Sequence, residues 1–432
     1  MTNEVAGETR TGRPPLEFGS GPLADIDLTR PEVHAERDLG EVWGLLREEQ
    51  PVAWHPTADG GFWVVSSYAA AVEVYRNSDV YTSARGNVLA TLLTGGDPAG
   101  GKMLPVSDGP RHQQIRRVLL RALTPRALAG LAEQVRGATL RLVREAVRRG
   151  DCDLGHEVAP HIPLAVICDL LMVPEQDREL LLTQSKLALA SEGPGGTEIE
   201  ARLARNEILL YFARLARSRR DTPGDDILGL LIQMTRSPIA LTDQELLYNA
   251  YSLLLGGDET TRLSMIGTVH ALTRWPDEWA RLRAGEVSVE TAVEEFLRWT
   301  TPTLHAGRVA TEDTVLGGRR IGRDDIVTVW NSSANFDPRQ FDEPTRLRLS
   351  RAPNRHLTFA IGPHFCLGAQ LARIELGALV AALVRTTDAM ELIGEPKRLY
   401  SNFLSGFNRL PVRFTAARDT RPPHPAEEGE VR

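Results

Sequence analysis

Apolar side chains recur along most of the chain at the spacing of an amphipathic or buried helix. This pattern predicts helices over residues 39–49, 127–149, 163–171, 177–190, 198–218, 242–274, 291–300 and 369–384. Shorter β-branched and aromatic runs beside turn residues predict strands at 52–54, 62–65, 314–321, 325–330 and 410–414, the first two as a hairpin. The sequence therefore predicts a mainly α fold with smaller β-sheets, of the α+β class.

The longest helical pattern contains residues that a buried helix does not favour. It begins with a capping box at 242–245, and its middle reads Gly-Gly-Asp-Glu-Thr at 256–260. Glycines and charges inside a buried helix cost stability. Gly256 and Gly257 would let a flat ligand approach the backbone, and the Thr260 hydroxyl can bond to a carbonyl of the preceding turn. We expect a function here, and a helix kink without chemistry is the alternative.

The two ends of the chain are rich in proline and charge, and they offer little to bury. We expect an N-terminal arm at 1–30, one folded domain at 31–417 and a disordered tail at 418–432. Between 81 and 105, glycines alternate with leucines, which is typical of a lid over an apolar site or of an ordinary surface loop. The glycine-rich residues 191–197 predict a flexible connection between two helices.

Composition excludes several classes of protein. A chain of 432 residues that is 42% hydrophobic can bury a large core. Its net charge of −7 and the lack of a basic arm argue against nucleic-acid binding. Three cysteines imply no disulfide framework. Without an apolar signal segment or a run of ~18 apolar residues, we expect a cytoplasmic protein that does not bind membranes.

One cysteine stands where a loop meets a helix. Gly362 and Gly368 flank Cys366 and allow backbone N–H groups to approach its sulfur. The helix that follows adds unpaired amide donors and the positive end of its dipole. Both effects favour a thiolate.

A thiolate in such a loop can serve three kinds of chemistry. It can be a nucleophile with His364 or His356 as its base, a zinc ligand, or the axial ligand of a haem. Zinc needs further ligands, and Cys152 and Cys168 do not form a Cys-x-x-Cys pair. Spacing alone does not exclude the nucleophile.

The loop as a whole resembles a known cofactor site. Residues 359–368 carry the pattern F-x-x-G-x-x-x-C-x-G, which resembles the haem-binding loop of the cytochrome P450 haem-thiolate monooxygenases. Ala360 stands where many members have glycine. The resemblance is to the soluble actinobacterial type, and it implies haem b held in a loop that includes Phe359, Gly362 and Gly368, with Cys366 as the iron ligand.

Other motifs of this family occur in the family's order. Residues 108–116 resemble D-P-P-x-H-x-x-x-R, with Gly109 for the first proline. This resemblance implies that the haem propionates are held by the following residues: His112, Arg116, Arg308 and His356.

Two further motifs resemble the family's helical signatures. Residues 256–260 are similar to G-G-x-[DE]-T, which implies that Glu259 and Thr260 deliver protons to bound oxygen. Glu295 and Arg298 match E-x-x-R, which implies a structural role beneath the haem.

The resemblance implies a monooxygenase that inserts one oxygen atom from O2 into a C–H bond. The apolar residues near the lid suggest a large, mainly apolar substrate, such as a polyketide, macrolide or peptide secondary metabolite, with His305 and Asn249 as polar anchors. Electrons would come from NAD(P)H through a ferredoxin reductase and a ferredoxin, and the basic residues Arg117, Arg121 and Arg126 are suited to an acidic donor. The alternatives are an oxidative cyclisation or coupling enzyme and a non-catalytic haem sensor.

Overall fold

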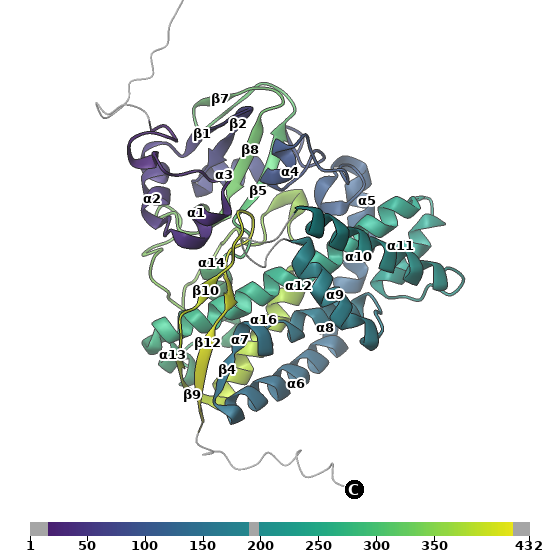
Figure 1. The fold of residues 1–432 in the computed structure, drawn as a ribbon, viewed down its shortest axis with the longest axis vertical. Coiled ribbons are helices and arrows are strands. Elements are labelled where there is room, and N and C mark those ends of the chain that lie inside the picture. The colour runs from purple at the N-terminus through teal and green to yellow at the C-terminus, as the bar shows by residue number, and fades with distance from the viewer. Residues whose placement is uncertain (1–15, 190–197, 418–432) are drawn as a thin grey trace, which may run out of the picture.

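The computed structural model describes residues 16–189 and 198–417 (Figure 1). Its α-helices are α1 (Pro31–Glu36), α2 (Gly40–Glu49), α3 (Tyr68–Arg76), α4 (Leu89–Leu93), α5 (Gly109–Leu119), α6 (Pro125–Arg149), α7 (Leu154–Glu157), α8 (His161–Leu170), α9 (Arg178–Ala188), α10 (Glu198–Ser218), α11 (Ile227–Thr235), α12 (Asp243–Arg274), α13 (Pro276–Arg283), α14 (Val289–Thr300), α15 (Asn331–Ala334) and α16 (Ala369–Thr386).

The strands form small sheets at the margins of the helical body. They are β1 (Val52–Thr57), β2 (Gly60–Val65), β3 (Tyr81–Thr82), β4 (Asp151–Asp153), β5 (His305–Ala310), β6 (Thr314–Leu316), β7 (Arg319–Ile321), β8 (Ile326–Trp330), β9 (Thr387–Leu392), β10 (Lys397–Arg398), β11 (Phe407–Arg409) and β12 (Pro411–Ala416). The largest sheet has the order β1-β2-β8-β5-β3, and the others pair β4-β12-β9, β10-β11 and β6-β7. The fold class is the α+β class that the sequence predicts.

Helix α12 runs through the middle of the helical body (Figure 1). It packs against α8, α10, α14 and α16, and α16 also packs along α6. The capping box at its start is formed, because the Thr242 hydroxyl accepts from the Glu245 amide while the Glu245 carboxylate accepts from the Thr242 amide. These contacts fix α12 opposite the start of α16, where the cysteine loop ends.

Most of the predicted elements are present, with ends shifted by a few residues. The hairpin pairs Val52 with Val65, as the alternating pattern predicts. The predicted helix at 291–300 begins at Val289, and its N-cap is Ser288. Helices α11 and α13 are not among the predicted elements.

The predicted N-terminal arm is wrong for the part of it that the structure describes. Phe18, Leu23 and Leu28 are buried in one cluster with Trp43 and Trp330. Residues 16–30 therefore belong to the folded domain. The predicted disordered tail, residues 1–15 and the hinge at 191–197 lie outside the described residues.

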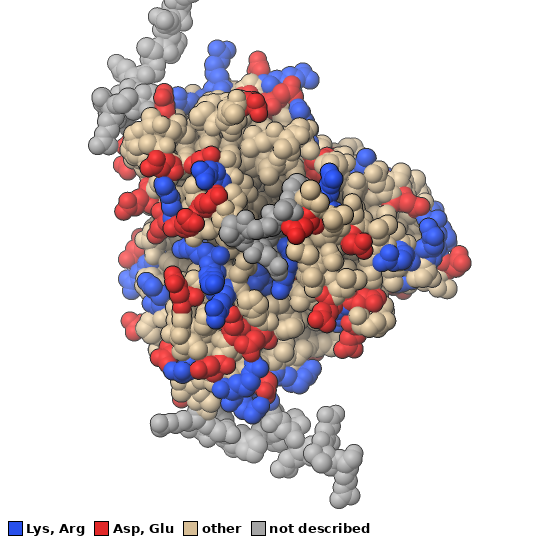
Figure 2. All heavy atoms as spheres, viewed as in Figure 1, with Lys and Arg blue, Asp and Glu red and all other residues tan. Residues whose placement is uncertain are grey.

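Two surface properties bear on possible partners. On the face shown in Figure 2, acidic and basic side chains of the described residues are interspersed. Across residues 16–189 and 198–417, no helix is long and apolar enough to cross a membrane.

Candidate active site

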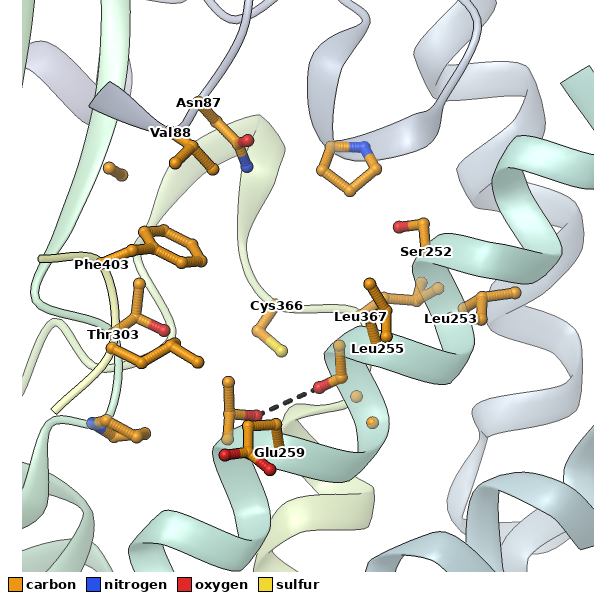
Figure 3. Close-up of a pocket in the computed structure, with 18 of the residues that line it drawn as sticks. Asn87, Val88, Ser252, Leu253, Leu255, Glu259, Thr303, Cys366, Leu367 and Phe403 are labelled. Carbon is orange, nitrogen blue, oxygen red and sulfur yellow. Dashed lines mark hydrogen bonds between the residues drawn. The ribbon is translucent and has the colours of Figure 1, made fainter. Parts of the chain in front are cut away.

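A cavity of about 1050 Å³ lies between α12, the cysteine loop with the start of α16, β5 and the segment 83–107. Figure 3 shows Cys366 with its sulfur directed into this space, opposite the segment of α12 that carries Leu255 and Glu259. The apolar side chains around it include Val88, Leu253, Leu255, Leu367, Leu371 and Phe403. The predicted lid lines the cavity through residues of and around α4, so the long glycine-rich segment covers the site.

The backbone of the cysteine loop differs in part from expectation. Gly362 has φ 75°, and a Cβ there would lie 2.6 Å from the Tyr75 carbonyl oxygen, so only glycine fits. Gly368 has φ −86° at the N-cap of α16 and needs no glycine for its conformation. Ala360 has φ 52°, which is strained for a residue with a side chain. The loop closes through the Cys366 amide, which donates to the Phe359 carbonyl at 2.9 Å.

The Cys366 sulfur is enclosed by protein on most sides but is exposed toward the cavity. Burial raises the pKa of this thiol, although a hydrogen bond from the Gly368 backbone and the positive charges of Arg116 and Arg373 oppose the rise. The hydrogen bond from Gly368 acts in the direction that the sequence predicts, toward the thiolate. A bound metal cation is the kind of partner that holds such a sulfur deprotonated.

Cationic and imidazole side chains line one side of the cavity. Arg308 is 5% exposed, lies 5.5 Å from the centre of the Tyr75 ring, and donates to the Gly307 carbonyl at 2.6 Å. Among the described residues, no carboxylate forms an ion pair with it. Arg116 and His112 also line the cavity, and Arg116 donates to the Phe365 carbonyl at 2.5 Å. An unpaired buried guanidinium is costly, so this side of the cavity favours a ligand with carboxylates.

His356 does not lie with these residues. Its Nε2 is 3.3 Å from Oε2 of Glu294, which also pairs with Arg373 at 2.6 Å, and His356 is not part of the cavity wall. His364 takes the expected place, because it lines the cavity with its ring 4.5 Å from that of His112. The implied propionate contact of His356 is thus not supported. The signal that was missed is the position of His364 two residues before the cysteine.

Helix α12 is continuous through its middle, and the Thr260 side chain makes the predicted bond to the preceding turn. The Thr260 hydroxyl donates to the Gly256 carbonyl at 3.1 Å, across one turn of the helix. A Cβ on Gly256 would meet no atom within 4 Å, so this glycine faces open space. A Cβ on Gly257 would lie 3.0 Å from Ile167, so that glycine serves helix packing instead. Close approach of a flat ligand is therefore expected at Gly256 alone.

Glu259 is buried and already paired. Its carboxylate accepts from Arg262 at 2.8 and 2.5 Å, and Arg262 also donates to the Asn408 side chain at 3.2 Å. Arg262, three residues along the same helix face, is a partner that the motif did not indicate. Its charge neutralises Glu259 in a position that is 1% exposed.

Two other buried acids lack such partners. Both carboxylate oxygens of Asp258 and Oε2 of Glu375 have no hydrogen-bond partner among the described residues. Burial and the neighbouring Glu259 charge raise the pKa of Asp258 to about 7, and burial together with Asp258 raises the pKa of Glu375 strongly. Both acids therefore favour the neutral form near pH 7 or below.

The E-x-x-R pair is fully buried, as the motif implies. Glu295 accepts from Arg298 through two bonds of 2.8 Å and from Arg351 at 3.0 Å. Arg298 also donates to the carbonyls of Asn335 and Pro344. This network fixes the chain that leads into the cysteine loop.

Of the two polar anchors expected for the substrate, Asn249 lines the cavity and His305 does not, and both bind the lid. The Asn249 side chain accepts from the Leu104 amide at 2.9 Å and donates to the carbonyls of Lys102 and Glu245. His305 accepts from the Leu89 amide at 3.0 Å and is not part of the cavity wall. Both residues therefore fasten the segment 83–107.

Taken together, these features fit a haem. The sulfur of Cys366 opens onto the cavity, Gly256 leaves space on the opposite wall, and Arg308 has no carboxylate partner in the described chain. A porphyrin is flat, binds iron that accepts a thiolate, and carries carboxylates at one edge.

Comparison with known proteins agrees with this geometry. The family model for cytochrome P450 matches residues 203–389. Cytochrome P450 NovI of Streptomyces niveus is 44% identical over 395 residues, covering 91% of this chain and 97% of that protein. A steroid C26-monooxygenase of Rhodococcus jostii is 32% identical, covering 95% of this chain and 88% of the relative.

A solved structure matches along the same length. It is that of P450 OxyD, which is involved in the biosynthesis of vancomycin-type antibiotics, with a TM-score of 0.83, 36% identity and coverage of 91% of this chain and 100% of that one. The match over nine tenths of the chain, added to a cysteine that faces Gly256 and Thr260 of the central helix, shows that the chain belongs to the cytochrome P450 family of bacterial monooxygenases.

Proposed function

We propose that the protein oxygenates a C–H bond of a large, mainly apolar secondary metabolite, with haem b held between α12 and the cysteine loop. The observation that carries this proposal is the Cys366 sulfur, which opens onto the same cavity as Gly256 and the hydrogen-bonded Thr260 of α12. A haem with a thiolate ligand supplies the electron density that promotes O–O bond cleavage.

The residues proposed to hold the haem surround the cavity on three sides. Cys366 would bind the iron, and Phe359, Gly362 and Gly368 shape the loop around it. His112, Arg116, Arg308 and His364 would bind the propionates.

Proton delivery is proposed for α12. The Thr260 hydroxyl is held by the Gly256 carbonyl, so its oxygen can accept a bond from a proton donor within the cavity. The Glu259 carboxylate can take part only after it releases Arg262, because both of its oxygens accept from that guanidinium. A carboxylate paired with arginine carries no proton, so Glu259 would first take up a proton from solvent, leave Arg262 and then donate that proton toward Thr260.

The shape and lining of the cavity support the substrate class. About 1050 Å³ accommodates a cofactor together with a further organic molecule, and the walls are mostly leucine, valine and phenylalanine. Asn87, Thr303 and Asn402 add polar groups. The antibiotic pathway named for OxyD supports a secondary metabolite as substrate.

The proposal includes electron delivery from NAD(P)H through a ferredoxin reductase and a ferredoxin, in the cytoplasm. Arg117, Arg121 and Arg126 are exposed at the end of α5 and the start of α6, and none forms an ion pair with a described residue. Free cations beside the helix that carries Arg116 suit an acidic donor.

The test is turnover with dioxygen, a surrogate ferredoxin system and compounds that shift the ferric Soret band. We expect an oxygenated product from the intact protein, whereas Thr260→Ala should bind haem normally but divert reducing equivalents to peroxide. Thr260→Ser, which keeps the hydroxyl, is the control. Unchanged coupling in Thr260→Ala contradicts the role of Thr260. A coupled or cyclised product without added oxygen identifies an oxidative coupling enzyme, and haem binding without turnover identifies a sensor.

A further inference from the structure

Asp108 occupies the N-cap position of α5 but does not cap this helix. Aspartate is favoured at an N-cap because its carboxylate accepts from amides of the first turn. Here no such bond forms, and Gly109 follows with φ 66°. Both carboxylate oxygens of Asp108 instead accept hydrogen bonds from other segments of the chain.

One oxygen closes the base of the lid. Oδ2 of Asp108 accepts from the Thr82 hydroxyl at 2.6 Å, the Ser83 amide at 2.7 Å and the Ala84 amide at 3.1 Å. These donors lie where the segment 83–107 leaves β3, and Asp108 lies where the same segment enters α5. The single carboxylate thus ties together the two ends of a segment whose residues Asn87, Val88 and Thr91 line the cavity.

The other oxygen holds the cysteine loop. Oδ1 lies 2.7 Å from Nε2 of His364. Burial by itself would raise the pKa of Asp108, but the hydrogen bonds from His364 and Thr82 lower it to about 2, so the carboxylate is ionised. An ionised carboxylate only accepts hydrogen bonds, so Nε2 of His364 carries a proton.

This contact fixes which nitrogen of His364 is left for a ligand. The Ser83 hydroxyl is also near Nε2, at 3.3 Å, and no hydrogen bond to Nδ1 is formed within the described residues. The ring packs against that of His112 and lines the cavity. Two residues of α5 contact the same loop: the His112 ring packs on the His364 ring, and Arg116 donates to the Phe365 carbonyl. Because these residues follow Asp108 by four and eight positions, all three contacts come from one face of the helix.

We propose that Asp108 is a positioning residue that fixes the His364 ring at the carboxylate edge of the haem and joins this ring to the base of the lid. The inference rests on the proposed function, since it needs haem in the cavity. It makes the lid and the cofactor share one anchor. A change at the base of the lid would therefore alter the position of the His364 ring. If a separate residue held the lid, the same change would leave this ring in place.

The test compares Asp108→Asn with Asp324→Asn. Asp324 also fastens the lid, through an exposed pair with Arg85 at 2.6 Å, but it does not touch His364. Asparagine at position 108 keeps only one acceptor oxygen for the four groups that bond to Asp108, and the negative charge of the carboxylate is lost. We expect haem transfer from Asp108→Asn to apomyoglobin to be roughly tenfold faster or more, with a shifted midpoint potential, while Asp324→Asn behaves as the parent protein.

A second set of variants keeps the inference testable if Asp108→Asn is unstable. His364→Gln should also speed haem transfer, and Asp108→Asn added to His364→Gln should change the rate little further, because Asp108 acts through that ring. Independent, multiplicative effects of the two substitutions overturn the proposal, as does parental haem transfer in Asp108→Asn. If the parent protein itself binds no haem after reconstitution, the proposed function fails first, and this outcome is separate from the other two.

Discussion

The two regions that flank the cavity, the packing beneath the cysteine loop and the middle of α12, differ in how completely their buried acids are paired. Beneath the cysteine loop, Glu295 is bound by Arg298 and Arg351, and Glu294 is bound by Arg373. On α12, Glu259 is paired with Arg262, whereas the neighbouring Asp258 has no hydrogen-bond partner among the described residues. The fully paired region beneath the cysteine loop suits a ligand that must stay fixed, and the incompletely paired region of α12 suits water and protons that must move.

The largest effect is expected from removing the carboxylate of the ion-pair network beneath the cysteine loop. Glu295→Ala leaves two buried guanidiniums without their carboxylate, and loss of one partner of a buried pair costs about 3–5 kcal/mol. Chemical denaturation of the haem-loaded protein measures the loss. Glu290→Ala, at an exposed position of the same helix, is the control. Equal small losses in both variants would contradict a structural role for the Glu295 network.

A substitution in the middle of α12 is expected to lower the rate of product formation. Glu259→Gln cannot transfer a proton, and proton transfer by a positioned side chain typically contributes 10²–10⁴-fold. We expect product formation to fall by about 100-fold or more while haem content stays normal. Asp243→Asn, an exposed acid at the start of the same helix, should leave the rate unchanged. A parental rate in Glu259→Gln would remove this acid from the mechanism.

The unpartnered Asp258 predicts an unusual dependence of stability on pH. Its pKa is raised to about 7 in the folded chain by burial and by Glu259, above the unfolded value near 3.8. Between these values the folded state binds more protons than the unfolded state, so the contribution of Asp258 to stability is full below about pH 4 and is lost as the pH rises through 7. Compared with the parent, Asp258→Asn should gain stability from pH 5 to pH 8, by a few kcal/mol at most. Parallel stability curves for the two proteins would show that Asp258 is ionised when folded.

The smallest predicted effect concerns the strained loop residue. Ala360 has φ 52°, so Ala360→Gly should stabilise the protein by about 1 kcal/mol. Ala129→Gly, at an exposed position in the second turn of α6, should destabilise it by about the same amount. Thermal unfolding of the two variants and the parent protein measures whether each substitution raises or lowers stability. A loss of stability in both would show that the positive φ carries no strain.

Local motifs made part of this site predictable. Cys366, Thr260 and the Glu295–Arg298 pair stand in short patterns whose geometry follows from a loop or one helix turn. His364 and Asp108 are 256 residues apart in sequence, so their contact depends on the whole fold. The resemblance implied a propionate contact for His356, ten residues before the cysteine, but its ring contacts Glu294 and is not part of the cavity wall. The partner of Glu259 was missed although Arg262 is only three residues away.

Composition predicted the ends of the chain less well than the motifs predicted the site. The proline-rich residues before 31 predict an arm, yet Phe18, Leu23 and Leu28 are buried against β2 and α2 neighbours such as Phe62 and Leu46. A few well-placed apolar side chains are enough to fix a polar segment when a complementary surface exists elsewhere in the fold.

The most direct test of the iron ligand is the spectrum of the reduced protein with carbon monoxide. The parent protein and Cys152→Ala should both show the red-shifted Soret band of thiolate ligation, and Cys366→Ala should lack it even when haem is retained. A red-shifted band that persists in Cys366→Ala, or that is absent from the haem-loaded parent, would contradict ligation by Cys366.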